Sequence, residues 1–149
     1  MTSAAVNPGS TWLMIGGALS IAAALLHIAC IFGGPEWYRF FGAGEGMARA
    51  AARGEWQPTI ITLCIAAVLL IWAAYAFSGA GILPRLPLLR TGLVTITAFY
   101  LIRALAFVPV NFASRQYTDS FAIWSSLIVL IFGAVYAIGT VKAWRHVVP

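Results

Sequence analysis

The stretch Thr11–Phe32, TWLMIGGALSIAAALLHIACIF, is apolar over its whole length, and His27 is its one basic or acidic residue. An α-helix needs about 20 apolar residues to cross the hydrocarbon of a bilayer. Three further stretches of this kind follow, over residues 58–77, 90–108 and 120–140. The sequence therefore predicts an all-α integral membrane protein, a four-transmembrane-helix bundle that forms a single transmembrane domain over residues 1–149.

Composition excludes a soluble protein. Hydrophobic residues make up 62% of the 149 residues and charged residues 9%, whereas soluble domains have about 45–50% and about 25%. The net charge of +5 comes from basic residues near span ends, where they act as topology signals and contact anionic lipids rather than nucleic acid. Since four spans bury little surface within one chain, we expect the bilayer and a homo-oligomer, a dimer or trimer, as partners.

The connection over residues 34–57 is predicted to be structured. A helical turn begins at Gly34-Pro35, and Gly42 and Gly44 break it. An Ala-rich helix over Glu45–Arg53 follows, and its charges recur every four residues, so they share one face. The fold class therefore includes a short amphipathic helical loop between helices 1 and 2, which we expect to cover one end of the bundle as a lid.

The other two connections are short, which favours antiparallel neighbouring helices. Small residues recur at four-residue spacing in the first span, at Gly16, Ser20 and Ala24, and in the fourth, at Gly133 and Ala137. Such spacing permits close contact between transmembrane helices. The bundle is therefore expected to pack through these faces.

We call the end that carries both termini and the connection between spans 2 and 3 side one, and the opposite end side two. Four basic residues lie on side one: Arg85, Arg90, Lys142 and Arg145. Four also lie on side two: Arg39, Arg49, Arg53 and Arg115. All four acidic residues share side two: Glu36, Glu45, Glu55 and Asp119. The count of basic residues is thus equal on the two sides. Because three of the side-two arginines lie near acidic partners, we expect both termini to be cytoplasmic, in a bacterial inner (plasma) membrane.

Two spans carry a basic residue well inside the apolar stretch, His27 in the first and Arg103 in the third, each about five residues short of its side-two end. Such residues usually face a protein interior or a wet cavity and mark functional sites. We therefore predict a one-sided intramembrane pocket that binds a lipophilic small molecule with a polar head, such as a quinone, isoprenoid, sterol or lipid. Further ligand-binding candidates near this level are Tyr100, Trp124, Asn111, Cys64 and Asp119.

In this prediction Arg103 holds the polar head, and His27 and Glu45 are the candidate catalytic residues. Histidine titrates near neutral pH and suits acid/base work. Each of these residues also has a purely structural interpretation. Arg103 could snorkel to the headgroups, His27 could bond a backbone carbonyl, Glu45 could form a surface ion pair, and Trp124 could anchor a span end. A non-catalytic assembly or accessory subunit is therefore the alternative function.

No sequence motif identifies a cofactor or a catalytic class. The chain has no GxSxG, P-loop or HExxH motif. The two cysteines, Cys30 and Cys64, lack metal-ligand spacing, so no metal site is predicted. We expect them to be core residues, with a disulfide or a redox pair as the alternatives.

Arg49-Ala50, followed by Glu55-Trp56-Gln57-Pro58 at the start of the second span, resembles the MAPEG family, the membrane-associated enzymes of eicosanoid and glutathione metabolism. That family has a similar Arg-Ala, then Asn, then Glu-x-x-Pro arrangement. This chain lacks the Asn, has one residue fewer in the spacing, and adds His27. The resemblance implies a second alternative function, a trimeric enzyme that binds glutathione near Arg49, Glu55 and Arg103.

Overall fold

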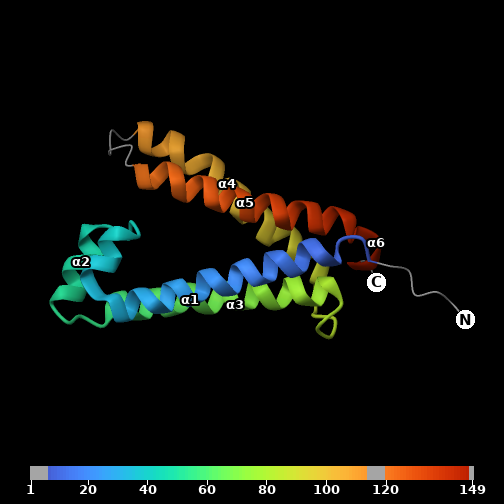
Figure 1. Cartoon of the computed structure of the whole chain (residues 1–149), viewed down its shortest axis with the longest axis horizontal. Helices are drawn as coiled ribbons and strands as arrows, with labels where there is room; N and C mark the ends of the chain where they lie inside the picture. The colour runs from blue at the N-terminus through green and yellow to red at the C-terminus, as the bar shows by residue number, and fades with distance from the viewer. Residues whose placement is uncertain (1–6, 114–119, 148–149) are drawn as a thin grey trace, which may run out of the picture.

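The computed structural model describes residues 7–113 and 120–147, and the side chains of 7–106 and 123–147. The described chain forms six helices: α1 Ser10–Phe40, α2 Glu45–Ala52, α3 Gln57–Ala80, α4 Leu89–Ala113, α5 Ser120–Lys142 and α6 Trp144–Val147 (Figure 1). Within it, α1, α3, α4 and α5 are long and apolar enough to cross a membrane. The predicted fold class, an all-α four-helix membrane bundle, is confirmed.

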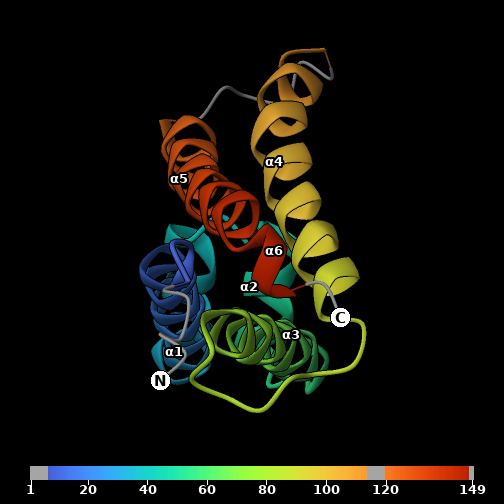
Figure 2. The same ribbon diagram turned by 90° about the vertical axis from the view of Figure 1, so that its right-hand side faces the viewer.

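The four long helices form two pairs, because α1 packs along α3 and α4 packs along α5. The pairs meet at side one, where α1 begins and α5 ends, and they diverge toward side two (Figure 1). Viewed from side one, α5 lies over α1 and α4 over α3 (Figure 2). The contacts between the pairs are therefore concentrated in the half of the molecule near side one.

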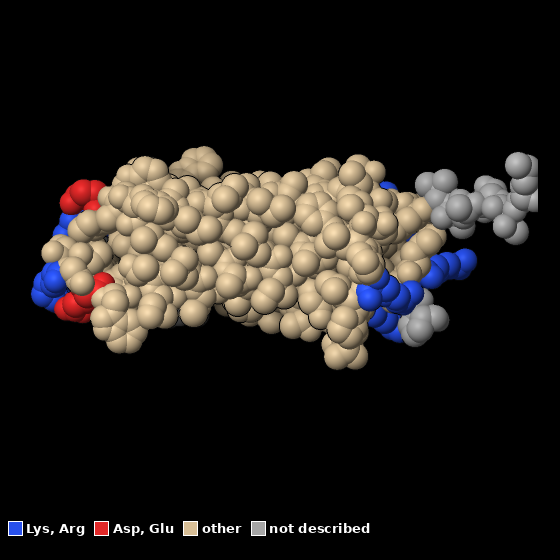
Figure 3. All heavy atoms as spheres, turned by 90° about the horizontal axis from the view of Figure 1, so that it is seen from below, with Lys and Arg blue, Asp and Glu red and all other residues tan. Residues whose placement is uncertain are grey.

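Charged side chains lie at the two ends of the molecule, separated by a broad belt without Lys, Arg, Asp or Glu on the face shown in Figure 3. Only basic groups are visible at side one, whereas basic and acidic groups occur together at side two. Such a belt, with charges at both rims, is the surface expected of a protein whose helices cross a bilayer. The described residues thus fit an integral membrane protein.

Helix α1 changes direction at Gly34, whose backbone is non-helical (φ 66°, ψ −154°). A side chain at this position would be strained, and Pro35 follows without a backbone N–H to continue the ladder. The membrane-crossing part of α1 therefore ends here. The remaining turn, to Phe40, and α2 lie beside α1 and α3 at the side-two end.

Helix α4 differs from its predicted boundary. The third span was expected to end at Val108, before Pro109, but α4 continues through Pro109 to Ala113. Proline removes one backbone N–H and often ends a helix in water. In a membrane the neighbouring helical hydrogen bonds are kept because no water replaces them, and proline is tolerated.

Small residues bring α1 close to α5 near side one. The four-residue series Gly16, Ser20 and Ala24 is buried along α1. At Gly9, a Cβ atom would lie about 2.3 Å from the carbonyl oxygen of Gly139 and 2.5 Å from the amide nitrogen of Ala143. Because both are backbone atoms, a Cβ at residue 9 could be accommodated only if the end of α5 moved.

Gly9→Ala should therefore destabilise the protein by about 1–3 kcal/mol, the usual cost of overpacking a fixed contact. Unfolding of the detergent-purified chain by heat or denaturant measures this. Gly46→Ala is the matched control, because a Cβ there meets nothing within 4 Å, and it should leave stability unchanged or slightly higher. Equal stability of the two variants would contradict the close approach.

Candidate functional site

A buried hydroxyl cluster joins all four long helices. Ser20 Oγ of α1 lies 2.8 Å from the hydroxyl of Tyr136 in α5 and 3.3 Å from that of Tyr100 in α4. The Tyr136 hydroxyl donates to the carbonyl oxygen of Trp72 in α3 at 3.2 Å. Ser20 and Tyr136 are 0% exposed and Tyr100 is 5% exposed. We call Ser20, Tyr100, Tyr136 and the Trp72 carbonyl the hydroxyl cluster.

The donors and acceptors of the hydroxyl cluster follow from the Trp72 carbonyl, the group at its end that can only accept. A carbonyl only accepts, so the single Tyr136 proton goes to Trp72. Ser20 then donates to Tyr136, and Tyr100 donates to Ser20. Every hydroxyl thus donates once, which satisfies groups that would be costly to leave unpaired in an apolar interior.

Sequence reasoning identified Tyr100 but missed Ser20, Trp72 and Tyr136 as parts of one constellation. The four-residue spacing of Gly16, Ser20 and Ala24 marked the inner face of α1 correctly. It could not reveal the partner hydroxyl, because the pairing of helices is a tertiary property. The Tyr100 ring also packs on Trp72, with ring centroids 5.0 Å apart.

His27 lies on the same face of α1 as Ser20, seven residues toward side two, and its side chain is partly buried. Its Nδ1 lies 2.8 Å from the carbonyl oxygen of Ala23 on its own helix. Because that oxygen can only accept, Nδ1 carries a proton, and in the neutral ring Nε2 is the acceptor. This contact matches the structural interpretation of His27, a bond to a backbone carbonyl, and still leaves Nε2 for another partner.

Arg103 lies on the inner side of α4, three residues beyond Tyr100 and beside the buried Ala104. Its side chain is partly buried. Because α4 continues to Ala113, ten residues separate Arg103 from the helix end (113 minus 103), or about 15 Å at helical rise. Arg103 is thus farther from the end of its helix than predicted, whereas His27 lies seven residues before the break in α1 at Gly34 (34 minus 27).

Several predicted site residues do not lie on the inner faces. The thiol residue Cys64 is exposed on α3, and Trp124 on α5 is 63% exposed. Neither faces the interior of this chain, so we exclude both from the pocket proposed below. The side chains of Asn111 and Asp119 lie outside the described residues. Cys30 is buried, as expected, but Cys64 is exposed, so its assignment to the core is wrong. Both are free cysteines, so the alternative of a disulfide is wrong as well.

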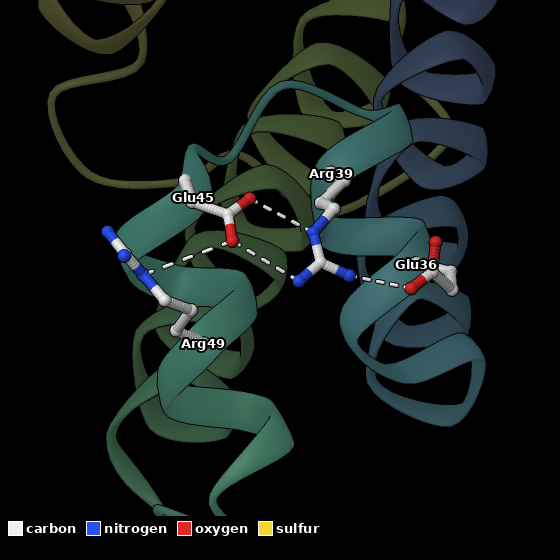
Figure 4. Close-up of polar contacts among 4 residues, drawn as sticks. All are labelled: Glu36, Arg39, Glu45 and Arg49. Carbon is white, nitrogen blue, oxygen red and sulfur yellow. Dashed lines mark hydrogen bonds and ion pairs between the residues drawn. The ribbon is translucent and has the colours of Figure 1, made fainter.

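Glu45 takes part in an ion-pair network on the exposed loop (Figure 4). Arg39 donates to its two carboxylate oxygens, from Nε at 3.0 Å and from Nη2 at 3.2 Å. The Nη1 of Arg39 also donates to Glu36 Oε1 at 2.6 Å. The Nε of Arg49 lies 3.9 Å from Glu45 Oε1. Hydrogen bonding to Arg39 holds the pKa of Glu45 below its usual range, and the charges of Arg39 and Arg49 add to this. A carboxylate whose pKa is lowered is a weaker base, which favours a structural role.

Within the described residues, no group of three or more His, Cys, Asp or Glu side chains could hold a metal ion. Comparison with known protein families, with curated proteins and with solved structures found no match. The hydroxyl cluster, His27 and Arg103 are therefore the features of the described chain that bear on its function.

Tyr136→Phe should destabilise the protein by about 1 kcal/mol, because it removes the hydroxyl that links Ser20 to the Trp72 carbonyl. Tyr75→Phe is the matched control. The Tyr75 hydroxyl donates to Pro87 at an exposed position, so its loss should change stability little. Unfolding of both variants in one detergent gives the comparison, and equal loss would contradict a special role for the cluster.

Arg39→Gln should raise the pKa of Glu45 toward the ordinary carboxyl value of about 4.3. The pairing stabilises the folded loop above that ordinary value, and this contribution disappears as the pH falls through the lowered value of the folded state. Carboxyl ¹³C NMR titration measures the shift. Arg53→Gln is the control, since Arg53 pairs with Glu55, and it should leave Glu45 unchanged. An unchanged pKa in Arg39→Gln would contradict the assigned cause.

Proposed function

We propose that this protein binds a lipophilic small molecule with a polar or anionic head between its two helix pairs, in the half of the membrane near side two. The observation that carries the proposal is the run of polar side chains on inner helix faces. It begins at the hydroxyl cluster and extends through Arg103 of one pair and His27 of the other. A quinone, isoprenoid, sterol or lipid has the matching chemistry, an apolar body with one polar end.

The divergence of the pairs supports this location. The pairs are joined by the hydroxyl cluster and by close contacts near side one, and they separate toward side two (Figure 1). A site between two packed units can admit a ligand without opening either unit. Within a bilayer such a ligand enters from the acyl chains, and only its polar head needs a partner from the protein.

The two ionisable groups have different roles in the proposal. Arg103 is a permanent cation with several donors, suited to a carbonyl, phosphate or carboxylate head. His27 fixes Nδ1 on Ala23, so its Nε2 is the atom that exchanges a proton with the ligand. Glu45, on the exposed loop, orients Arg39 and so holds the loop at the mouth of the site.

The accessory-subunit alternative is favoured by a different observation. Within the most apolar window of each span, only 28–33% of the residues are buried. Lipid covers part of this surface, and we propose that further copies of the chain, as a dimer or trimer, cover the rest. In the accessory alternative a different membrane protein covers the same faces.

We place both termini in the cytoplasm. Lys and Arg are equal in number on the two sides, but on side two Arg39, Arg49 and Arg53 pair with glutamates. Side one is thus the more strongly basic end, which favours it for the anionic cytoplasmic leaflet. The proposed site then opens in the outer half of a bacterial inner membrane. A glutathione site of the MAPEG kind has less support, because Arg49 lies near Glu45, and Glu55 pairs with Arg53.

Native mass spectrometry of the chain in mild detergent should detect a co-purified lipophilic molecule together with the oligomer number. Added short-chain quinone, isoprenoid alcohol or sterol should then raise the unfolding temperature in at least one case. Arg103→Ala should weaken that ligand about 10–100-fold, the loss expected when a charged hydrogen bond is removed, without changing oligomer size.

Arg53→Ala is the matched control. It removes the same charge from an exposed position outside the spans, where Arg53 pairs only with Glu55 among the contacts described, and should keep the ligand-induced shift. Arg103→Ala with an undiminished shift would remove Arg103 from the site. No co-purified molecule and no response to any of the three additives would favour the accessory role, and retention on immobilised glutathione would favour the third alternative.

A further inference from the structure

A second candidate site lies at the opposite end of the molecule, on side one. A surface hollow of about 680 Å³ is formed there by six residues: Pro8, Val141, Lys142, Trp144, Arg145 and His146. The apolar span of α5 ends at Lys142, so the hollow lies where the hydrocarbon gives way to the headgroups. Its volume is within the range of small-molecule sites, about 300–1,000 Å³.

The hollow is held in place by two basic residues that do not line it. Arg85, from the connection between α3 and α4, donates from Nη2 to the carbonyl oxygen of Val147 at 2.6 Å. The guanidinium of Arg90 lies over the Trp144 ring, 3.9 Å from its centroid. Val147 is 1% exposed. These contacts fix α6 against the side-one end of the bundle, so tertiary packing defines the position of the hollow.

The charges around the hollow are not compensated by the protein's acidic side chains. The segments that form side one contain four basic residues and no Asp or Glu. On side two, by contrast, Arg39, Arg49 and Arg53 all pair with glutamates. Lys142 and Arg145 therefore present two cations at the membrane surface with His146 beside them.

We propose that this hollow binds the headgroup of an anionic phospholipid. Lys142 and Arg145 hold the phosphate, because ammonium and guanidinium groups are its natural donors. Trp144 is 36% exposed, and its ring occupies the interfacial level that tryptophan prefers. The Val141 side chain, 72% exposed, contacts the start of an acyl chain. The site is independent of the His27 and Arg103 pocket, and it ties side one to the anionic leaflet.

The test uses the full chain in nanodiscs made of equal parts phosphatidylglycerol and phosphatidylcholine. After gentle release, native mass spectrometry counts the lipids of each kind that remain bound. The unmodified chain should retain phosphatidylglycerol preferentially. In the Lys142→Gln/Arg145→Gln variant that preference should fall about 30-fold, which corresponds to about 2 kcal/mol for two basic residues at a membrane surface.

Arg49→Gln/Arg53→Gln is the matched control, since it removes two charges at the other end, where glutamates already pair them. It should keep the preference, and circular dichroism should show that both variants keep their helices. Equal retention of the two lipids by the unmodified chain, or an equal loss in both variants, would overturn the proposal. Displacement of the bound lipid by millimolar inorganic phosphate would also overturn it, because the site would then recognise a free phosphate compound.

Discussion

The hydroxyl cluster is the contact on which the arrangement of the helices depends. In hydrocarbon no water can satisfy a polar group, so an unpaired hydroxyl costs several kcal/mol. Ser20, Tyr100 and Tyr136 satisfy one another only when their three helices lie in one register. The Trp72 carbonyl brings the fourth helix into the same register. The cluster thus fixes one helix pair on the other near side one, and the divergence toward side two begins beyond it.

The packing around this cluster differs from that in a soluble protein, because many large apolar side chains face outward beside a small buried core that includes Leu13 and Leu93. Ser20 and Ala24 are fully buried on α1, whereas Leu25 is 60% and Phe32 86% exposed. Lipid tails are as apolar as leucine, so burying large apolar side chains gains little in a membrane. Close approach of small residues and a few internal hydrogen bonds therefore contribute to holding the helices together. This explains why Gly9 can contact the backbone of α5 directly.

The sequence was informative about the elements and uninformative about their mutual orientation. Four long apolar stretches suffice for four spans, because length and polarity decide insertion. Gly34 and Pro35 marked the break in α1, since their backbone chemistry is local. Small residues at four-residue spacing marked the inner face of α1, but the large apolar residues surround each span on every side, so their periodicity does not indicate which face turns inward. That is why Trp124 was assigned to the interior and Tyr136 was overlooked.

The continuation of α4 through Pro109 changes the distance between Arg103 and the end of its helix. A long basic side chain can reach the headgroups only when it lies near a helix end. Ten residues separate Arg103 from the end of α4, a rise of about 15 Å, or half of a hydrocarbon layer about 30 Å thick. Arg103 is thus farther from the end of its helix than the five residues on which the snorkelling interpretation rested. Arg103 lies one helical turn from Tyr100 of the hydroxyl cluster, and a cation inside an apolar span is stable only among polar groups of the protein, water or a ligand head.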